Sequence, residues 1–329
     1  MSQTLDAAPK AASKTPSTAT LKNLIRGDRP YILYAAFAVL IVAFSLASPV
    51  FFSSSNFLNI GRQTALVTII AVGMTFVIIA GEIDLSVAST LALSGMSAAM
   101  AIQGSGGNWA LGAAAGLATG ALVGLINGLL TTWLTIPSFL VTLGMLGIAR
   151  GVALMLTGTT PVVVNTVTFW DTFGEGAILG IPAPIFITIL VLGVGAYLLH
   201  FSTFGRKVFA TGGNATAARY SGINTRRTKT LAFVITGALA GLAGLILTAR
   251  AHAARPDIAA GLELDVIAAV ILGGTSLFGG RGAILGTLLG SLMIGVLNNG
   301  LTLMGVSSQA QLVVKGAIII AAVAFSRRK

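Results

Sequence analysis

Cysteine is absent from this sequence of 329 residues, and charged side chains are scarce. Without cysteine, the chain can form no disulfide bond and offers no thiol nucleophile or cysteine-ligated metal site. Its two histidines, His200 and His252, lie too far apart in the sequence to indicate a metal-binding cluster. Charged residues make up only 9% of the chain and hydrophobic residues 55%, with a mean hydropathy of +0.93. A soluble domain needs more charge to cover its surface, so the composition predicts a polytopic membrane protein.

A nucleotide-binding loop is also missing. The glycine-rich run at 273–282 resembles a phosphate-binding loop, but a Walker A loop requires Lys and then Ser or Thr directly after its last glycine. Here Gly279 is followed by Gly280 and Arg281, so we interpret the run as a tight turn between two helices. The sequence shows no grouping of acids, histidines and nucleophiles that would indicate an enzyme or a cofactor site. We therefore expect a non-catalytic protein, in which any work driven by ATP requires a partner.

Basic residues are distributed unevenly along the chain. The formal charge of +11 would indicate a nucleic-acid partner in a soluble protein, but in a membrane protein the excess of Lys and Arg in cytoplasmic loops accounts for it. Each span needs about 20 apolar residues, which leaves room for about ten spans. With both termini in the cytoplasm, this topology places most of the 20 basic residues on that side. We therefore expect an all-α, multi-pass protein with cytoplasmic termini.

Hydrophobic runs separated by polar breaks locate the expected spans. They cover residues 31–50, 64–80, a third run ending near 101, 109–132, 137–156, 181–200, 230–248, 262–272, 283–304 and 309–325. We expect residues 1–29 to be a disordered cytoplasmic tail and residues 30–329 to form one transmembrane domain. Residues 56–61 are expected to turn the chain. Residues 158–180, which contain acids and no base, are expected to form an outside loop.

Glycine recurs with a strict period of four in the fourth span. The glycines are Gly112, Gly116, Gly120, Gly124 and Gly128. On a helix they lie along one face without side chains, so the pattern predicts a neighbouring helix at very close distance.

Two parts of the chain contain similar sequence segments in the same order. Gly81-Glu-Ile-Asp-Leu-Ser-Val-Ala, before the third span, is similar to Gly261-Leu-Glu-Leu-Asp-Val-Ile-Ala at the eighth. Gly124-Leu-Ile-Asn-Gly-Leu in the fourth span is similar to Gly295-Val-Leu-Asn-Asn-Gly-Leu in the ninth. Both pairs are separated by five spans, and because five is odd the second copy is inverted. The echoes predict two inverted five-helix halves, an arrangement typical of transporters, with the pathway near their interface.

Polar side chains within this apolar chain are candidates for lining a translocation path. They are Glu82, Asp84, Asn127, Glu263, Asp265, Asn298 and Asn299. Ionisable groups at membrane depth are costly and usually functional, but carboxylates at helix starts also cap free N–H groups and complement the helix dipole. We favour capping for the four acids. The three amides offer donors and acceptors for sugar hydroxyls or hydrogen bonds between helices, and the sequence leaves both interpretations open.

The basic segment, residues 201–229, is the long polar interruption of the chain. It contains six of the 20 Lys and Arg residues and no acid. Within it, Asn214 is a candidate N-cap, residues 215–220 a short helix, Gly222 its C-terminal stop and Ile223 an apolar contact. A helix of two turns is marginal alone. We therefore favour a docking site for a cytoplasmic partner over a solvated segment that only sets the topology.

Three motifs resemble the ribose-type sugar ABC permeases: GEIDLS at 81–86, GGNATAARYSGIN at 212–224 and ELDVIAAVILGGTSLFGGRG at 263–282. The resemblance covers nearly the whole chain from residue 30. It implies the membrane subunit of a bacterial importer in the inner membrane, which works as a dimer with cytoplasmic ATPase subunits and a periplasmic sugar-binding protein. We expect a homodimer, and the sequence leaves a heterodimer with a sister permease open. The resemblance also implies that the basic segment carries a helix that couples to the ATPase. The residues that match this helix are Asn214, Ala217, Ala218, Arg219, Gly222 and Ile223, while Thr216 stands where the general permease pattern has Glu.

The resulting expectation is a permease for ribose or a similar monosaccharide, surrounded by membrane lipid and without a nucleic-acid partner. The alternative is an ion-coupled secondary sugar carrier that works without an ATPase. A proton-coupled carrier needs acids within its spans, and the middle of the expected spans contains almost none. The two hypotheses differ in whether this protein alone takes up sugar.

Overall fold

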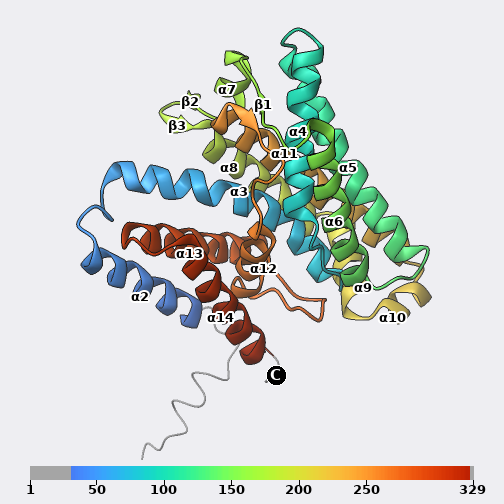
Figure 1. Cartoon of the computed structure of the whole chain (residues 1–329). Helices are drawn as coiled ribbons and strands as arrows, with labels where there is room; N and C mark the ends of the chain where they lie inside the picture. Colours follow the sequence, from blue (N-terminus) through green and yellow to red (C-terminus); the bar gives the residue numbers. More distant parts are fainter. Residues whose placement is uncertain (1–30, 327–329) are drawn as a thin grey trace, which may run out of the picture.

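The computed structural model describes residues 31–326 and consists almost entirely of helices (Figure 1). The expected tail at 1–29 lies outside the described residues. The helices are α2 (Tyr31–Ala47), α3 (Ser54–Ile79), α4 (Val87–Gly104), α5 (Trp109–Thr132), α6 (Ser138–Thr157), α7 (Val167–Phe173), α8 (Ala183–Ala196), η1 (Tyr197–Phe201), α9 (Thr203–Gly213), α10 (Ala215–Tyr220), α11 (Thr225–Ala251), α12 (Leu262–Leu272), α13 (Ile284–Leu303) and α14 (Ser308–Ser326). The strands are β1 (Val162–Val163), β2 (Ala177–Ile178), β3 (Ile181–Pro182) and β4 (Ala253–Ala254).

Within the described residues, 7 helices are long and apolar enough to cross a membrane. They are α3, α4, α5, α6, α8 continued by η1, α11 and α13. The chain is therefore a polytopic all-α membrane protein, as its composition predicts. α5 and α12 have the bounds expected from the sequence, but α12 is only about 16 Å long and too short to cross a bilayer core of about 30 Å by itself.

α3 is the central helix of the fold. Every residue from 64 to 79 is buried, so this apolar helix is surrounded by other helices instead of facing lipid. Its N-terminal end corrects one expectation, since residues 56–61 form the first turns of α3 instead of turning the chain. Ser53 Oγ caps the helix by accepting a hydrogen bond from Asn56 N at 3.2 Å, and Asn56 Nδ2 donates to Phe51 O at 2.9 Å.

The glycine face of α5 packs against α11 at backbone distance, as the period of four predicts. A Cβ atom on Gly120 would overlap the carbonyl oxygen of Gly237, and one on Gly124 would overlap that of Phe233. Helices approach this closely only where neither has a side chain in the way. α11 also packs against α3 and α4, so it is the second helix that lies inside the fold.

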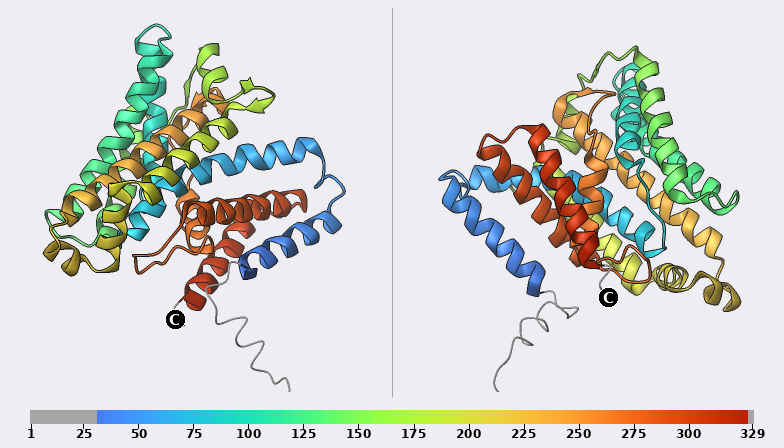
Figure 2. Two further views of the ribbon diagram at one scale, coloured as in Figure 1. Left: turned by 180° about the vertical axis from the view of Figure 1, so that it is seen from behind. Right: turned by 60° about the horizontal axis from the view of Figure 1, so that its bottom comes forward.

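Figures 1 and 2 show two groups of helices inclined to each other. α4 and α5 pack against α11, and α6 packs against α4 and α5, whereas α2, α12, α13 and α14 form a group with α3. α3 and α11 pack against each other where the groups meet, and α8 lies against α3 and α13. One hydrophobic core joins the groups and includes Ile70 and Phe76 of α3, Ala243 of α11 and Val270 of α12.

The two ends of the fold are built differently. At the upper end in Figure 1, the segment expected as an outside loop contains β1, α7 and β2. β1 pairs antiparallel with β4, Val162 opposite Ala254, and Trp170 stacks on His252 with ring centroids 3.9 Å apart. α9 and α10 lie at the opposite end (Figures 1 and 2). The start of α2 and the end of α14 lie on that same side, so both ends of the described chain share a face with the basic segment.

Candidate functional site

The basic segment folds as two short helices, α9 and α10, followed by the start of α11. Its first part, for which the sequence predicts no helix, forms α9, and Ser202 Oγ caps that helix by accepting from Gly205 N at 3.1 Å. A single residue, Asn214, separates α9 from α10. Asn214 Oδ1 accepts hydrogen bonds from the N–H groups of Thr216 at 3.0 Å and Ala217 at 2.9 Å. The side chain therefore satisfies two donors that the first turn of α10 leaves unpaired, as expected of an N-cap.

The C-terminal end of α10 is also fixed by local hydrogen bonds. Gly222 N donates to Arg219 O, and Ile223 N donates to Ala218 O, both at 3.0 Å. Gly222 has a φ of +82°, a left-handed conformation that glycine adopts with little strain. Together these form a Schellman motif, the arrangement in which glycine ends a helix. The predicted cap, helix and stop are all confirmed.

α10 projects from the end of the fold and is attached mainly through α9 (Figure 1). Ala218 is buried at 4% exposure, which places one face of α10 inward, whereas Tyr220 is 90% exposed. The sequence gives no local signal for this exposure of Tyr220, which lies two residues before Gly222.

The run at 273–282 forms the turn between α12 and α13, as expected, and it rests on the basic segment. Gly280 N donates to Ile79 O, the last residue of α3, at 2.9 Å. A Cβ atom on Gly280 would lie 2.8 Å from Gly213 Cα, and one on Gly279 would lie 2.7 Å from Gly212 O. The backbones of α9 and of this turn are therefore in direct contact, which only glycine on both sides allows.

An ion pair joins the start of α11 to the break between α3 and α4. Lys229 Nζ donates to Glu82 Oε1, and their side chains are 21% and 13% exposed. Glu82 thus neutralises a basic side chain from the basic segment instead of capping its own helix. Two residues so far apart in sequence give no local signal of this contact.

Asp84 connects the start of α4 to α5. Its Oδ1 atom accepts from Ser86 N at 2.8 Å and from Ser86 Oγ at 2.6 Å. Asn127 Nδ2 of α5 donates to Ser86 Oγ at 2.8 Å. All three side chains are buried. Asp84 therefore satisfies an N–H group at a helix start, as the capping interpretation predicts, and Asn127 forms a hydrogen bond between helices.

Asp265, Asn298 and Lys315 form a buried ionic cluster. Asp265 Oδ2 accepts from Lys315 Nζ at 2.8 Å and from Asn298 Nδ2 at 3.2 Å. The three side chains come from α12, α13 and α14, respectively. Asp265 lies in the first turn of α12, as expected of an acid at a helix start, but its carboxylate also joins three helices, which the sequence does not predict. The other oxygens of the cluster, Asp265 Oδ1 and Asn298 Oδ1, are buried and have no hydrogen-bond partner among the described residues.

Asn299 contacts a different helix from its neighbour Asn298. Its Nδ2 atom donates to Asn56 Oδ1 at 2.8 Å, and Asn56 Nδ2 donates back to Asn299 Oδ1 at 3.1 Å. This reciprocal amide pair joins α13 to α3.

Glu263 lies in the first turn of α12, where a negative charge complements the helix dipole. The amides Asn127, Asn298 and Asn299 all make hydrogen bonds between helices, which is one of the two interpretations left open by the sequence.

Comparison with known proteins places the chain in a family. Residues 56–323 match the family described as branched-chain amino acid transport system / permease component. The chain is 48% identical to the ribose import permease protein of Bacillus subtilis (strain 168), over 88% of this chain and 90% of that protein. It is 44% identical to the ribose import permease protein of Escherichia coli (strain K12), over 89% and 92%.

The L-arabinose transport system permease protein of the same Escherichia coli strain is 39% identical, over 91% of this chain and 90% of that protein. No solved structure matches the chain. The family match extends over more than half of the chain, from the first turn of α3 to beyond α13, and includes the basic segment and both polar clusters. The chain therefore belongs to the branched-chain amino acid transport system / permease component family.

Proposed function

We propose that this chain is the membrane-spanning subunit of a bacterial ABC importer that carries ribose or a similar monosaccharide across the inner membrane. The observation that carries the proposal is the 48% identity to a ribose import permease over 88% of this chain. A similar protein is named for L-arabinose, and both of these sugars are pentoses. The chain hydrolyses no ATP itself, and a separate ATPase subunit supplies the energy.

α10 is the contact for this ATPase. Three features support the role: α10 projects from the fold, it is locked at both ends by Asn214 and Gly222, and it exposes Tyr220. Arg219 adds a positive charge beside Tyr220. A short helix that is rigid without its partner loses little conformational freedom on docking. Closure of the ATPase would push α10, and α9 would pass the displacement to the spans.

Replacement of one exposed tyrosine tests the contact. Truncating an aromatic hot spot weakens a protein interface by about 2 kcal/mol or more, so Tyr220→Ala should weaken copurification of the ATPase about 30-fold. Sugar uptake and transport-coupled ATP hydrolysis should fall with it. The matched control is Tyr197→Ala, since Tyr197 is also exposed, at 63%, but lies on η1 away from α10. Normal ATPase binding by Tyr220→Ala would contradict the proposed contact.

The membrane topology has ten spans with both termini in the cytoplasm. α2 and α14 add to the 7 long apolar helices, and α12, which is too short to cross alone, completes the tenth crossing together with residues 252–261 before it. An even number of spans requires both termini on one side, and the start of α2 and the end of α14 lie on the α10 side of the fold (Figure 1). Cysteines introduced at 213 and 106 in this cysteine-free chain would test the orientation by labelling with membrane-impermeant reagents. Labelling of both sites from the same side would overturn it.

Two inverted halves, α2–α6 and α8–α14, form this protomer. Matched helix contacts support the division: α11 of the second half packs against α4 and α5, and its counterpart α3 packs against α12 and α13. The linked pairs Asp84–Asn127 and Asp265–Asn298 also occupy corresponding places in the two sequence echoes. Tilting of the halves about the α3–α11 contact opens the path alternately to each side.

The sugar passes the cluster of Asp265 and Asn298. Each residue has a buried oxygen without a partner among the described residues, and sugar hydroxyls are donors for such acceptors. Asn298→Leu should lower uptake strongly while the ATPase still binds. The adjacent Asn299→Leu is the control, because Asn299 is already paired with Asn56 and its loss should affect stability instead. Uptake by Asn298→Leu at the wild-type rate would exclude this part of the path.

The functional assembly is a dimer of this permease with two ATPase subunits and a periplasmic sugar-binding protein. The names of the ribose and arabinose relatives as transport-system permeases support a multi-subunit assembly. Vesicles that contain the permease alone should take up no sugar under an ion gradient. Vesicles that also contain the ATPase and the binding protein should take it up with ATP. Ion-driven uptake by the permease alone would instead identify a secondary carrier.

A further inference from the structure

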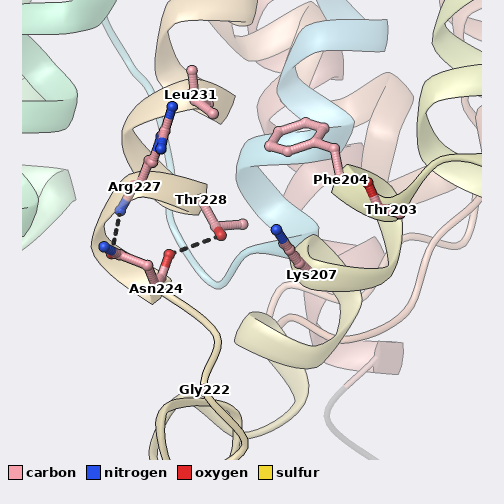
Figure 3. Close-up of a pocket in the computed structure, with 8 residues that line it drawn as sticks. All are labelled: Thr203, Phe204, Lys207, Gly222, Asn224, Arg227, Thr228 and Leu231. Carbon is pink, nitrogen blue, oxygen red and sulfur yellow. Dashed lines mark hydrogen bonds between the residues drawn. The ribbon is translucent and has the colours of Figure 1, made fainter.

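A pocket of about 420 Å³ lies between α9 and the start of α11 (Figure 3). Thr203, Phe204 and Lys207 of α9 line one side, and Arg227, Thr228 and Leu231 of α11 line the other. Figure 3 shows Lys207 and Thr228 facing each other across it. The pocket therefore combines cationic and hydroxyl groups beside the first turns of α9 and α11.

A second pocket of about 400 Å³ adjoins the first on the other side of α11. Arg227 and Leu231 line both pockets, and Leu129, Trp133 and Arg226 line only the second. Arg227 thus lies between a polar pocket and a largely apolar one. The two together form one continuous amphipathic surface.

The basic side chains of this surface are free to bind an anion. Lys207, Arg226 and Arg227 are exposed, and none of them forms an ion pair with any residue between 31 and 326. No acidic residue lines either pocket. Three positive charges with nothing to neutralise them attract a negatively charged group strongly.

The apolar pocket continues into the outer face of α5. Leu122, Ile126, Leu129 and Trp133 recur at helical spacing and are 56%, 36%, 39% and 67% exposed. α5 is long and apolar enough to cross the membrane, so this face lies against lipid acyl chains. An exposed tryptophan at the end of a span is typical of the membrane–water interface. The polar pocket therefore lies at the depth of lipid headgroups.

We infer that the two pockets together bind one anionic phospholipid from the adjacent leaflet. The phosphate lies between Lys207 and Arg227, and an acyl chain runs over Leu129 and Trp133. A free phosphate, or a carboxylate from a protein partner, would fill the basic pocket and leave the apolar one empty. A phospholipid matches both, because its charged and apolar parts are covalently joined in this order. The inference requires α5 to cross the membrane but does not depend on an ATPase at α10.

Fluorescence of Trp133 tests the inference in vesicles that contain the whole protein. Bromine atoms on acyl chains quench nearby tryptophan, and the signal of Trp133 is the difference between wild type and Trp133→Phe. One vesicle set carries brominated phosphatidylglycerol in plain phosphatidylcholine. A second set has the same composition but carries the bromine on phosphatidylcholine. We expect several-fold stronger quenching per brominated lipid in the first set, and equal quenching would overturn the inference.

Charge-removing variants show whether the pocket itself selects the lipid. Lys207→Gln and Arg227→Gln should each lower the preference for phosphatidylglycerol about fivefold, the usual contribution of one basic side chain near an anionic lipid surface. The matched controls are Arg206→Gln and Arg219→Gln, exposed bases of the basic segment that line neither pocket. An equal effect in the controls would indicate diffuse attraction and refute a specific site. Loss of the preference on addition of inorganic phosphate would show that the ligand is the free anion.

Discussion

Lys315→Met is the substitution that tests the buried ionic cluster most directly. The lysine donates to Asp265 Oδ2 at 2.8 Å, and their side chains are only 12% and 5% exposed. Methionine has a similar length and no charge, so the substitution removes the ammonium group and leaves the space filled. What remains is a carboxylate that is buried among helices without a cation.

The magnitude follows from the burial of both groups. Removing one partner of a buried ion pair costs about 3–5 kcal/mol, because the remaining charge is left uncompensated. Asp265 keeps its hydrogen bond from Asn298, at 3.2 Å, so we expect a loss of about 3 kcal/mol, at the lower end of that range. The double variant Asp265→Asn with Lys315→Met removes both charges. It should recover most of the loss and lie within about 1 kcal/mol of the wild type.

The free energy of unfolding in mixed detergent micelles, measured by titration with SDS, gives these differences. Lys207→Met is the control, because Lys207 is an exposed lysine without an ion pair among the described residues, and it should leave the stability unchanged. Two results would refute the reasoning: a Lys315→Met variant as stable as the wild type, or a double variant no more stable than Lys315→Met alone.

Three further predictions concern helix contacts and caps. Gly124→Leu places a side chain where the backbone of α11 lies and should destabilise the protein by about 3 kcal/mol or more. Gly147→Leu, on an open face of α6, is the control and should leave the stability unchanged. Thermal melting in detergent measures both. Asn214→Ala removes the cap of α10 and should cost that helix about 1 kcal/mol; transport-coupled ATP hydrolysis should fall while the melting temperature stays unchanged. Asn299→Leu leaves the amide of Asn56 unpaired and should cost about 1–3 kcal/mol, and replacing both by Leu should restore part of the loss; unchanged stability of the single variant would contradict the pairing.

Features with a local physical cause were predictable from the sequence. The bounds of α5 and α12 follow from polar breaks beside apolar runs, and the close approach of α5 to α11 follows from the period-four glycines. Asn214 and Gly222 cap and end α10 through hydrogen bonds within a few residues of each other. In such cases both partners lie close together in the sequence, so the interaction can be predicted without knowledge of the fold.

Features that depend on distant partners could not be predicted in this way. Residues 56–61 look like a turn in the sequence because Asn56 is polar. In the fold, the Asn56 amide pairs with that of Asn299 on α13, and these residues belong to α3. In the sequence Asp265 looks like a capping residue, and only the fold shows that Lys315 of α14 donates a hydrogen bond to it. The sequence of α9 looks like a loop because it is rich in glycine and basic residues, although Phe204, Val208 and Phe209 recur at helical spacing and pack into the core.

The glycine contact between α9 and the α12–α13 turn has a mechanical consequence. Two side chains in contact can change rotamer and absorb a displacement, but the backbones at Gly212 and Gly280 have no such freedom. The hydrogen bond from Gly280 N to Ile79 O adds the end of α3 to the same contact. We therefore expect this junction to be stiff under compression, so that a force applied along α9 would reach α3 and α13.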